Sequence, residues 1–153
     1  MRTNGERIQI FAKFLPLTKF SNMKNFLLIP FSIGITLCNA QSSQSIDTIK
    51  PPASYENIYN RPVFSDSLTS SFVIFIKKEV KSHKHVTHTE HVYILDGEGE
   101  MIVGDKKMKI KKGDIVLISK NTFHSLKVTS QTPMKVLSVQ SPLFDGKDRV
   151  MAE

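Results

Sequence analysis

A succession of short β-rich segments is the feature that most constrains the fold of this chain. From Ser71 onward, runs rich in Val, Ile, Phe and Met alternate with Gly, Asn and Lys, with a spacing of about ten residues. No window of helical length carries an apolar face with the helical period. The segments lie at residues 71–80, 90–97, 99–105, 107–118, 124–130 and 134–140. Short strands at this spacing predict an all-β sandwich or barrel.

Turn residues separate several of these segments. Asp-Gly at residues 96–97 and Gly-Asp at residues 104–105 each join two segments, and Gly-Asp at residues 113–114 opens another. Asn121 can adopt a positive φ just before the last His of the chain. Because such turns reverse the chain within a few residues, they predict that consecutive strands pair as a meander.

The chain before Ser71 has a different composition. Residues 41–70 are rich in Ser, Asn, Asp and Pro and contain only short apolar pieces. This composition predicts a flexible leader followed by an extended N-terminal arm that packs on the domain. The β-barrel itself is expected to span residues 71–153.

Residues 1–40 have the pattern of a secretory signal peptide. The uncharged apolar run Phe26–Cys38 follows Lys24 and is 13 residues long, whereas a membrane-spanning helix needs about 20. Small residues before a polar stretch predict cleavage after Ala40, so that the mature chain begins at Gln41. The pattern predicts a periplasmic or secreted bacterial protein with no stable membrane insertion after cleavage.

Two details refine this prediction. The sequence before Cys38 resembles a lipoprotein site, but Leu37 is larger than the residue such a site prefers, so lipid anchoring is the weaker interpretation. The stretch before Met23 is longer than a typical basic leader, and a more compact signal begins at Met23 itself. We therefore expect the translated chain to start at Met23.

Removal of the signal peptide changes the charge of the chain. The whole sequence has 21 Lys and Arg against 14 Asp and Glu, a formal charge of +7, and loss of residues 1–40 lowers that charge to +3. Lys107, Lys109 and Lys111 alternate with apolar residues, as on a strand with one solvent-exposed face. The basic composition thus reflects export, and no nucleic-acid partner is expected.

The composition also restricts the chemistry. Cys38 is the single Cys, so the predicted mature chain has no disulfide, no Cys nucleophile and no Cys metal ligand. A metal site must therefore consist of His and carboxylates. All five His lie within the β region, at His83, His85, His88, His91 and His124.

The spacing of these residues indicates which side chains can meet. His83 and His85 are two residues apart and point to the same face of a strand. Glu90 follows His85 at an odd spacing, so a turn at residues 86–89 must intervene before Glu90 can join that face. His91 then falls on the opposite face, and His88 shares the face of Glu90 only if the strand already begins there.

This arrangement resembles the cupin family. The first cupin motif contains two His separated by one residue, then a Glu and then a Gly. The chain matches it at His83, His85, Glu90 and Gly97, with the family's spacing. The second motif places a Gly and a His on later strands, and here these positions are Gly113 and His124.

The chain departs from the family pattern at four turn positions. Lys77, Ser119, Asn121 and Val128 stand where the family has Gly, Pro, Gly and Asn. Asn in place of Gly is a mild change, because Asn adopts the left-handed conformation readily.

The resemblance covers residues 71–140 and implies a single-domain double-stranded β-helix, or jelly-roll barrel. It also implies one divalent metal ion held by four residues: His83, His85, Glu90 and His124. Three imidazoles and one carboxylate suit Fe, Mn, Ni, Cu or Zn and leave positions open for water, O₂ or substrate. Pairing of barrels is common in the family, so a homodimer is expected.

Other polar residues are weaker candidates. His88, Tyr93 and Gln140 are the only additional catalytic candidates; for Tyr93 a packed aromatic, and for Gln140 a plain strand position, is the favoured interpretation. Asp145 and Asp148 are expected to be loop charges. The apolar lining of the cavity is expected to come from Ile94, Ile102, Leu117 and Leu126.

A barrel of this kind does not determine a reaction. The first hypothesis is a secreted metal-dependent enzyme of the dioxygenase, isomerase or lyase type that acts on a small polar molecule. The second is a non-catalytic module that binds a small molecule or sugar. The third is a periplasmic metal-handling protein, suggested by four His between His83 and His91.

Overall fold

The computed structural model describes residues 42–153. The predicted signal peptide, with the apolar run Phe26–Cys38 and the cleavage point before Gln41, lies outside the described residues. Within residues 42–153, no helix is long and apolar enough to cross a membrane.

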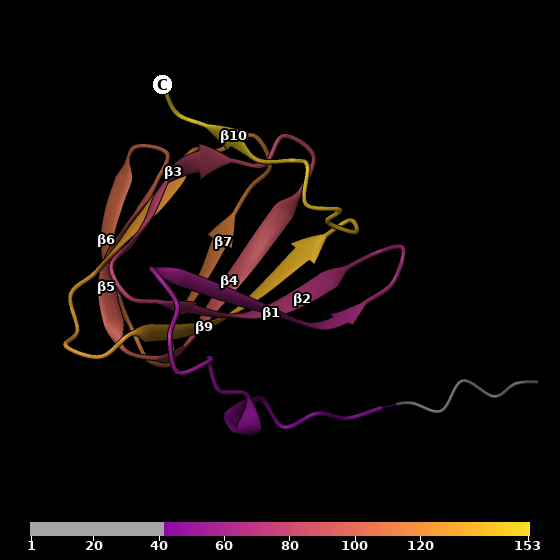
Figure 1. Cartoon of the computed structure of the whole chain (residues 1–153). Coiled ribbons are helices and arrows are strands. Elements are labelled where there is room, and N and C mark those ends of the chain that lie inside the picture. Colours follow the sequence, from indigo (N-terminus) through magenta and orange to yellow (C-terminus); the bar gives the residue numbers. More distant parts are fainter. Residues whose placement is uncertain (1–41) are drawn as a thin grey trace, which may run out of the picture. The chain divides into compact units, whose positions relative to one another are not determined.

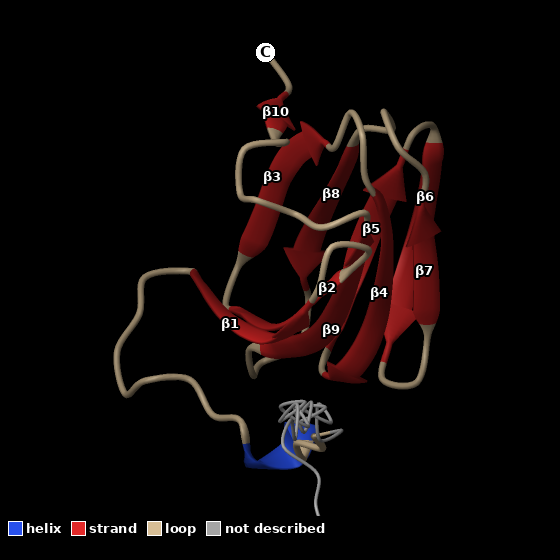
Figure 2. Ribbon diagram, turned by 90° about the vertical axis from the view of Figure 1, so that its right-hand side faces the viewer, coloured by secondary structure: helices blue, strands red, loops and turns tan. Residues whose placement is uncertain are grey.

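The described part of the chain forms two five-stranded sheets (Figures 1 and 2). The first sheet has the order β1-β2-β9-β4-β7 and consists of Ile58–Ser65 (β1), Ser70–Ile76 (β2), Met134–Ser141 (β9), Thr89–Asp96 (β4) and Ile115–Ile118 (β7). The second has the order β10-β3-β8-β5-β6 and consists of Val150–Met151 (β10), Glu79–Lys84 (β3), His124–Val128 (β8), Glu98–Val103 (β5) and Lys106–Lys111 (β6). All neighbouring strands are antiparallel. A single 3-10 turn, Ile46–Thr48 (η1), precedes the strands in the described region.

The predicted all-β jelly-roll barrel is confirmed, but the predicted meander is wrong. β1–β2 and β5–β6 are hairpins within one sheet, whereas every other connection carries the chain from one sheet to the other. The turns are tight as expected, and Asn121 has a φ of 61°. A turn sets only where the chain reverses, while burial of both apolar sheet faces decides which sheet receives the next strand.

The main core lies between the two sheets. On β4, Glu90, Val92 and Ile94 are buried, while His91 and Tyr93 between them are exposed. This alternation agrees with the predicted inward face of the strand. The buried apolar members of the core are Ile76, Val92, Ile94, Met101, Ile110, Val116, Ile118, Leu126, Met134 and Val136.

A smaller core covers the outer face of β2. Val73 and Phe75 point away from the barrel interior and pack with Ile49, which lies in the segment before the strands. Lys135 Nζ donates a hydrogen bond to the Ile46 carbonyl at 2.7 Å and fastens this segment. β2 is apolar on both faces because one faces the barrel and the other is covered by residues 46–63. Within the predicted arm, residues 58–65 form β1 and pair with β2.

Candidate metal centre and cavity

A cavity of about 190 Å³ lies between the sheets. Its polar lining consists of Asn60, His83, His85, Glu90, His124, Ser125, Gln140 and Arg149. Its apolar lining consists of Ile58, Ile74, Ile76, Val80, Val92, Met101, Ile118, Leu126, Val136 and Phe144. The cavity is smaller than the pockets of about 300–1,000 Å³ that hold drug-sized ligands.

The strand register gathers the polar residues at one end of the barrel. His83, near the end of β3, pairs with His124 at the start of β8. In the other sheet Glu90, near the start of β4, pairs with Gln140 near the end of β9. Antiparallel pairing therefore brings histidines from one sheet and a carboxylate from the other to the same cavity.

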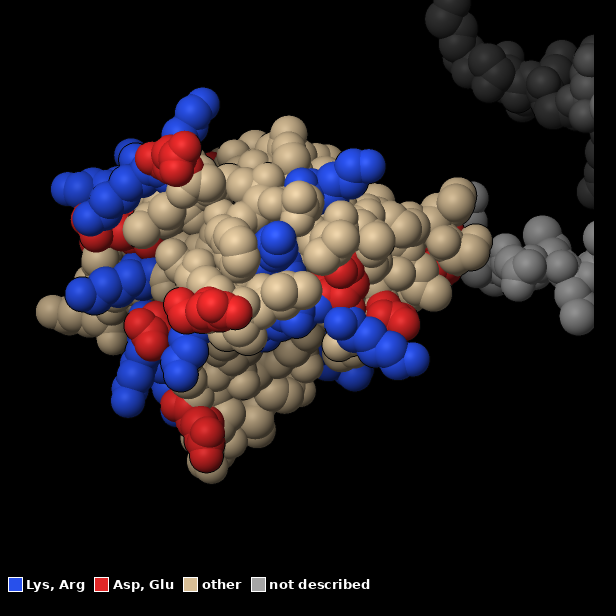
Figure 3. Space-filling view, turned by 90° about the horizontal axis from the view of Figure 1, so that it is seen from above, with Lys and Arg blue, Asp and Glu red and all other residues tan. Residues whose placement is uncertain are grey.

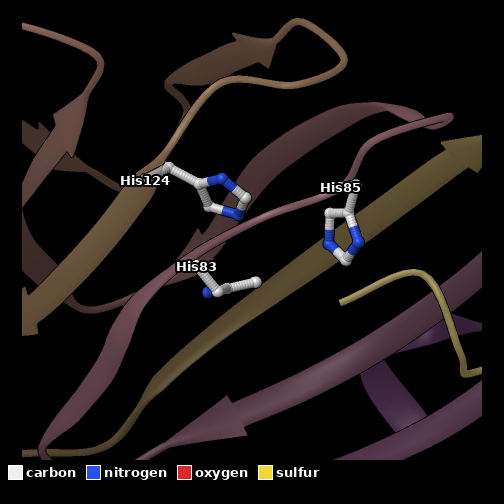
Figure 4. Close-up of side chains that lie close together, drawn as sticks. All are labelled: His83, His85 and His124. Atoms are coloured by element: carbon white, nitrogen blue, oxygen red, sulfur yellow. The ribbon is translucent and has the colours of Figure 1, made fainter. Parts of the chain in front are cut away.

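Three imidazoles converge in this cavity. His83, His85 and His124 each offer a ring nitrogen, and these atoms all lie within 4.8 Å of one another. Figure 4 shows the three side chains grouped together: His83 comes from β3, His85 follows the end of that strand, and His124 begins β8. All three side chains are buried, with at most 5% of their surface exposed. Such a group has the composition and the closeness of a metal-ligand set.

Hydrogen bonds determine which nitrogen of each of the three rings carries a hydrogen. Nδ1 of His83 lies 2.8 Å from the Lys81 carbonyl, and Nδ1 of His124 lies 3.1 Å from the Thr122 carbonyl. Nδ1 of His85 contacts the carbonyl of Asp148. Because a carbonyl oxygen only accepts, each Nδ1 carries a hydrogen, and in the neutral ring Nε2 then has a free lone pair. In metal sites, hydrogen bonds of this kind from the other ring nitrogen orient the histidine ligands.

Glu90 is held with one oxygen toward the protein and the other toward the imidazoles. Ser138 Oγ donates to Glu90 Oε1 at 2.5 Å, and Gln140 Nε2 donates to the same oxygen at 3.4 Å. Oε2 lies 3.5 Å from Nε2 of His124 and 3.8 Å from Nε2 of His85. Glu90 Oε2 therefore lies beside two of the three clustered imidazoles, and the four sequence-predicted residues His83, His85, Glu90 and His124 line one cavity.

The protonation states suit cation binding. Burial lowers the pKa of His83 to about 4, against an opposing hydrogen bond to the Lys81 carbonyl, so this imidazole is neutral at physiological pH. Burial raises the pKa of Glu90, but the nearby His124, the Ser138 hydrogen bond and His85 outweigh it, and the net shift is downward. A neutral His83 and an ionised Glu90 are the forms in which these side chains bind a divalent metal.

His88 does not belong to the group of candidate metal ligands. Asp148 was predicted to be a free loop charge, and this prediction is wrong. His88 Nδ1 lies 2.5 Å from Asp148 Oδ2, and its Nε2 lies 2.9 Å from the Leu143 carbonyl. The Asp148 carboxylate also accepts from the backbone N–H groups of Val86 and Thr87 at 2.9 Å. With an acceptor at each ring nitrogen, His88 has no lone pair for a metal and does not line the cavity. It closes the turn between β3 and β4.

The other catalytic candidates separate in the structure. Tyr93 is 39% exposed on the outer face of β4 and does not line the cavity, so it is neither a packed aromatic nor a candidate for catalysis. Gln140 is buried, contacts Glu90 and lines the cavity, contrary to the plain strand position favoured from the sequence. Asp145 is exposed and pairs with Lys147 at 3.8 Å, as expected of a loop charge.

The predicted apolar lining is only partly correct. Leu126 lines the cavity, and Ile94 is buried in the core without lining it. Ile102 and Leu117 point outward and are exposed. Ile102 is next to the buried Met101, and Leu117 is next to the buried Ile118. Adjacent residues of a strand face opposite sides, so an error of one residue in the expected inward face accounts for both wrong predictions.

Three residues of the site were not predicted from the sequence. Ser138 shares the inward parity of Gln140 on β9, a signal that was available in the sequence. Phe144 and Arg149 line the cavity from the irregular segment after β9. Their positions follow from long-range contacts of that segment, and local periodicity contains no such information.

Fold and site together define a class of protein, a double-stranded β-helix barrel with a histidine-rich cavity between its sheets. The family model of the cupin domain matches residues 72–140. An uncharacterized protein of Aquifex aeolicus is 37% identical over 84 residues, which cover 55% of this chain and 69% of that protein. The chain belongs to the cupin superfamily.

Two further comparisons extend this result. The L-ectoine synthase of Aliivibrio fischeri is 30% identical over 87 residues, which cover 55% of this chain and 68% of that enzyme. An uncharacterized protein of Klebsiella pneumoniae with a double-stranded β-helix domain superposes with a TM-score of 0.62 at 22% identity, over 74% of this chain and 99% of that one. The second likeness shows the shared fold, and the first shows that enzymes occur among the relatives.

Proposed function

We propose that this protein is a metal-dependent cupin enzyme that acts on a small polar molecule. The observation that carries the proposal is the cluster of three buried imidazoles, in which each Nδ1 is hydrogen-bonded to a backbone carbonyl and Nε2 of the neutral ring is left free to bind a metal. A structural barrel has no need for three buried imidazoles and a buried carboxylate, because burying polar groups is costly. The similarity to an enzyme such as L-ectoine synthase supports the catalytic part of the proposal.

The residues of the chain would divide the work as follows. His83, His85, His124 and Glu90 would hold one divalent ion of Fe, Mn, Ni, Cu or Zn, which supplies Lewis-acid chemistry or, if redox-active, O₂ chemistry when bound. Ser138 and Gln140 orient Glu90 by hydrogen bonds to its Oε1. The apolar lining excludes water from the rest of the cavity and limits the size of the substrate.

A specific observation supports a second function, binding without turnover. Among the residues that line the described cavity, the only titratable side chains are the four proposed ligands and Arg149. Neither His88 nor Tyr93 reaches the cavity to act as a separate acid or base. The metal-handling hypothesis has less support, because the three clustered imidazoles are buried and so do not form an exposed site of easy exchange.

Metal analysis of the full chain, purified without chelator, tests the proposal. We expect one divalent ion per chain, lost in His124→Ala and retained in His91→Ala, which removes an exposed His next to Glu90. Retention in both variants, or absence of metal from the unmodified protein, would contradict it. Turnover of a substrate with the loaded protein then separates the enzyme from the binding module. Because residues 1–40 are predicted to be an export signal, we also propose that the substrate lies outside the cytoplasm.

A further inference from the structure

Arg149 is a charged residue of the cavity for which the proposed metal centre has no use. It lies just before β10, where Val150 pairs with Lys84 and Met151 pairs with His83. The Ala152 N–H also donates to the Ser82 carbonyl at 3.0 Å. These contacts fix the backbone of the C-terminal segment beside the β3 histidines. Arg149 is both exposed and part of the cavity lining, so its side chain lies at the mouth.

The guanidinium of Arg149 has no acceptor within the described residues. No carboxylate of residues 42–153 forms an ion pair with it, and its side chain makes no hydrogen bond there. Burial lowers the pKa of Arg149 while the charge of Glu90 raises it. The nearby Asp148 carboxylate is already taken by Val86, Thr87 and His88. A planar guanidinium that has no acceptor among the described residues is free to bind an oxyanion of a ligand, with two parallel hydrogen bonds.

The charge of the cavity also favours an anion. The Glu90 carboxylate contributes one negative charge to the cavity lining, and the Arg149 guanidinium contributes one positive charge. If the proposed divalent ion is present, two positive charges remain without a partner. Because uncompensated charge in a partly buried site is costly, a ligand with a negative group is favoured over a neutral one. This step rests on the proposed function.

Gln140 adds a second requirement for the ligand, which is a hydrogen-bond donor. Its Nε2 faces Glu90 Oε1, so its Oε1 is the free end of the amide, and this buried oxygen has no hydrogen-bond partner among the described residues. Gln140 is only 5% exposed, and its side chain lines the cavity. A buried acceptor without a partner is costly unless a ligand supplies a donor such as a hydroxyl.

We propose that the cavity binds a small hydroxycarboxylic acid, with its carboxylate on Arg149 and its hydroxyl donating to Gln140 Oε1. The volume of about 190 Å³ limits the ligand to a small molecule. The apolar lining around Val92, Leu126 and Val136 accommodates a short carbon chain. A phosphate ester with a fully polar body fits that part of the cavity less well.

Calorimetric titration of the full chain with simple probes tests this proposal. The probes are 2-hydroxybutyrate, its neutral amide 2-hydroxybutanamide, butyrate without the hydroxyl, and inorganic phosphate. We expect 2-hydroxybutyrate to bind at least about ten-fold more tightly than the amide, because the amide has no charge for Arg149. Butyrate is expected to bind more weakly than 2-hydroxybutyrate, because Gln140 Oε1 then stays without a donor.

Two variants assign the effect to Arg149. Arg149→Gln is expected to weaken 2-hydroxybutyrate binding at least about ten-fold and to remove the preference over the amide. Lys147→Gln removes the same charge two residues earlier, from a side chain that does not line the cavity, and is expected to change the affinity by less than about two-fold. Circular dichroism checks that Arg149→Gln is folded, as expected for a guanidinium with no protein partner.

The outcomes separate this proposal from the proposed metal centre. Equal affinity for the acid and the amide, unchanged binding in Arg149→Gln, or no binding of 2-hydroxybutyrate would overturn it. Tighter Arg149-dependent binding of phosphate than of any carboxylate would overturn the assigned ligand class. Metal content measured on the same samples is independent of these results. A chain without metal that still shows Arg149-dependent carboxylate binding would contradict the metal centre alone.

Discussion

Individual histidines of this barrel have opposite pKa shifts because their partners differ. His83 is buried beside two other imidazoles, and this burial lowers its pKa to about 4. His88 is buried as well, but its hydrogen bonds to the Leu143 carbonyl and the Asp148 carboxylate outweigh burial and raise its pKa. One residue type thus serves as a candidate metal ligand in the cavity and as a hydrogen-bonded bridge in a turn.

These opposite shifts predict a maximum in the stability of the metal-free protein near pH 6.5. Below that pH the unfolded state binds a proton that His83 in the folded state does not, so acidification lowers the free energy of unfolding, by about 3 kcal/mol as the pH reaches about 4. The His88 contribution is fully present below pH 6.5 and is lost as the pH rises through its raised folded pKa. Urea unfolding with chelator, from about pH 4.5 to about pH 8.5, measures both sides.

Three variants test which histidine causes the loss of stability on each side of the pH maximum. His83→Asn is expected to flatten the acid side, and His88→Asn is expected to flatten the alkaline side. His91→Asn alters an exposed side chain and is expected to leave both slopes in place. A stability that does not change between about pH 4.5 and 6.5 would contradict the assignment to His83.

Sequence and structure agree at residue scale where a short-range rule decides the position of a side chain. Strand parity and one turn were enough to group His83, His85 and Glu90, and the family motif added His124. Parity does not show which face of a strand is inward, so Ile102 and Leu117 were assigned to the wrong face. It also does not show what closes the site from distant parts of the chain, so Phe144 and Arg149 were missed.

At the scale of elements, the segment after β9 completes the site. It supplies Phe144, whose ring lies edge-on to His85 and His88 with centroids 5.2 and 5.3 Å away. It also supplies the Asp148 carbonyl that accepts from His85, and the Asp148 carboxylate that holds the β3–β4 turn. His88 and Asp148 are 60 residues apart in sequence, so no local pattern predicts their contact.

Asp148 is therefore expected to control metal affinity without being a ligand. Hydrogen bonds hold its pKa below the ordinary value in spite of burial, so it is a carboxylate throughout the physiological range. Asp148→Asn puts an amide donor next to N–H donors of the turn that separates His85 from Glu90. We expect metal affinity to fall about 10- to 100-fold, as for other groups that orient metal ligands. Competition with a chromophoric chelator measures this change.

Asp145→Asn is the matched control for that prediction. Asp145 lies on the same segment, is exposed, and pairs only weakly with Lys147. This variant removes the same charge and is expected to keep the affinity of the unmodified protein. Equal affinities in Asp145→Asn and Asp148→Asn would show that the Asp148 carboxylate does not position the metal ligands.

At the scale of the whole molecule, the described fold and site belong to one compact unit, Gln41–Glu153. Both cores, the cavity and the cluster of histidines lie in this unit. Basic and acidic side chains are interspersed over the face seen in Figure 3. The homodimer expected from the family, the absence of a nucleic-acid partner and export all stay predictions.

The last of these predictions has a direct consequence for stability. If residues 1–40 act only in export, a chain that begins at Gln41 contains every contact on which folding depends. We expect its melting temperature to agree with that of the full chain within about 2 °C, because no described hydrogen bond or core contact is removed. Differential scanning calorimetry of both chains, with equal metal loading, measures the difference.

In a bacterial host that exports the full chain, N-terminal sequencing should then find Gln41 as the first residue. A lower melting temperature for the shorter chain, or an exported product that retains Phe26–Ala40, would show that the N-terminal segment belongs to the working protein.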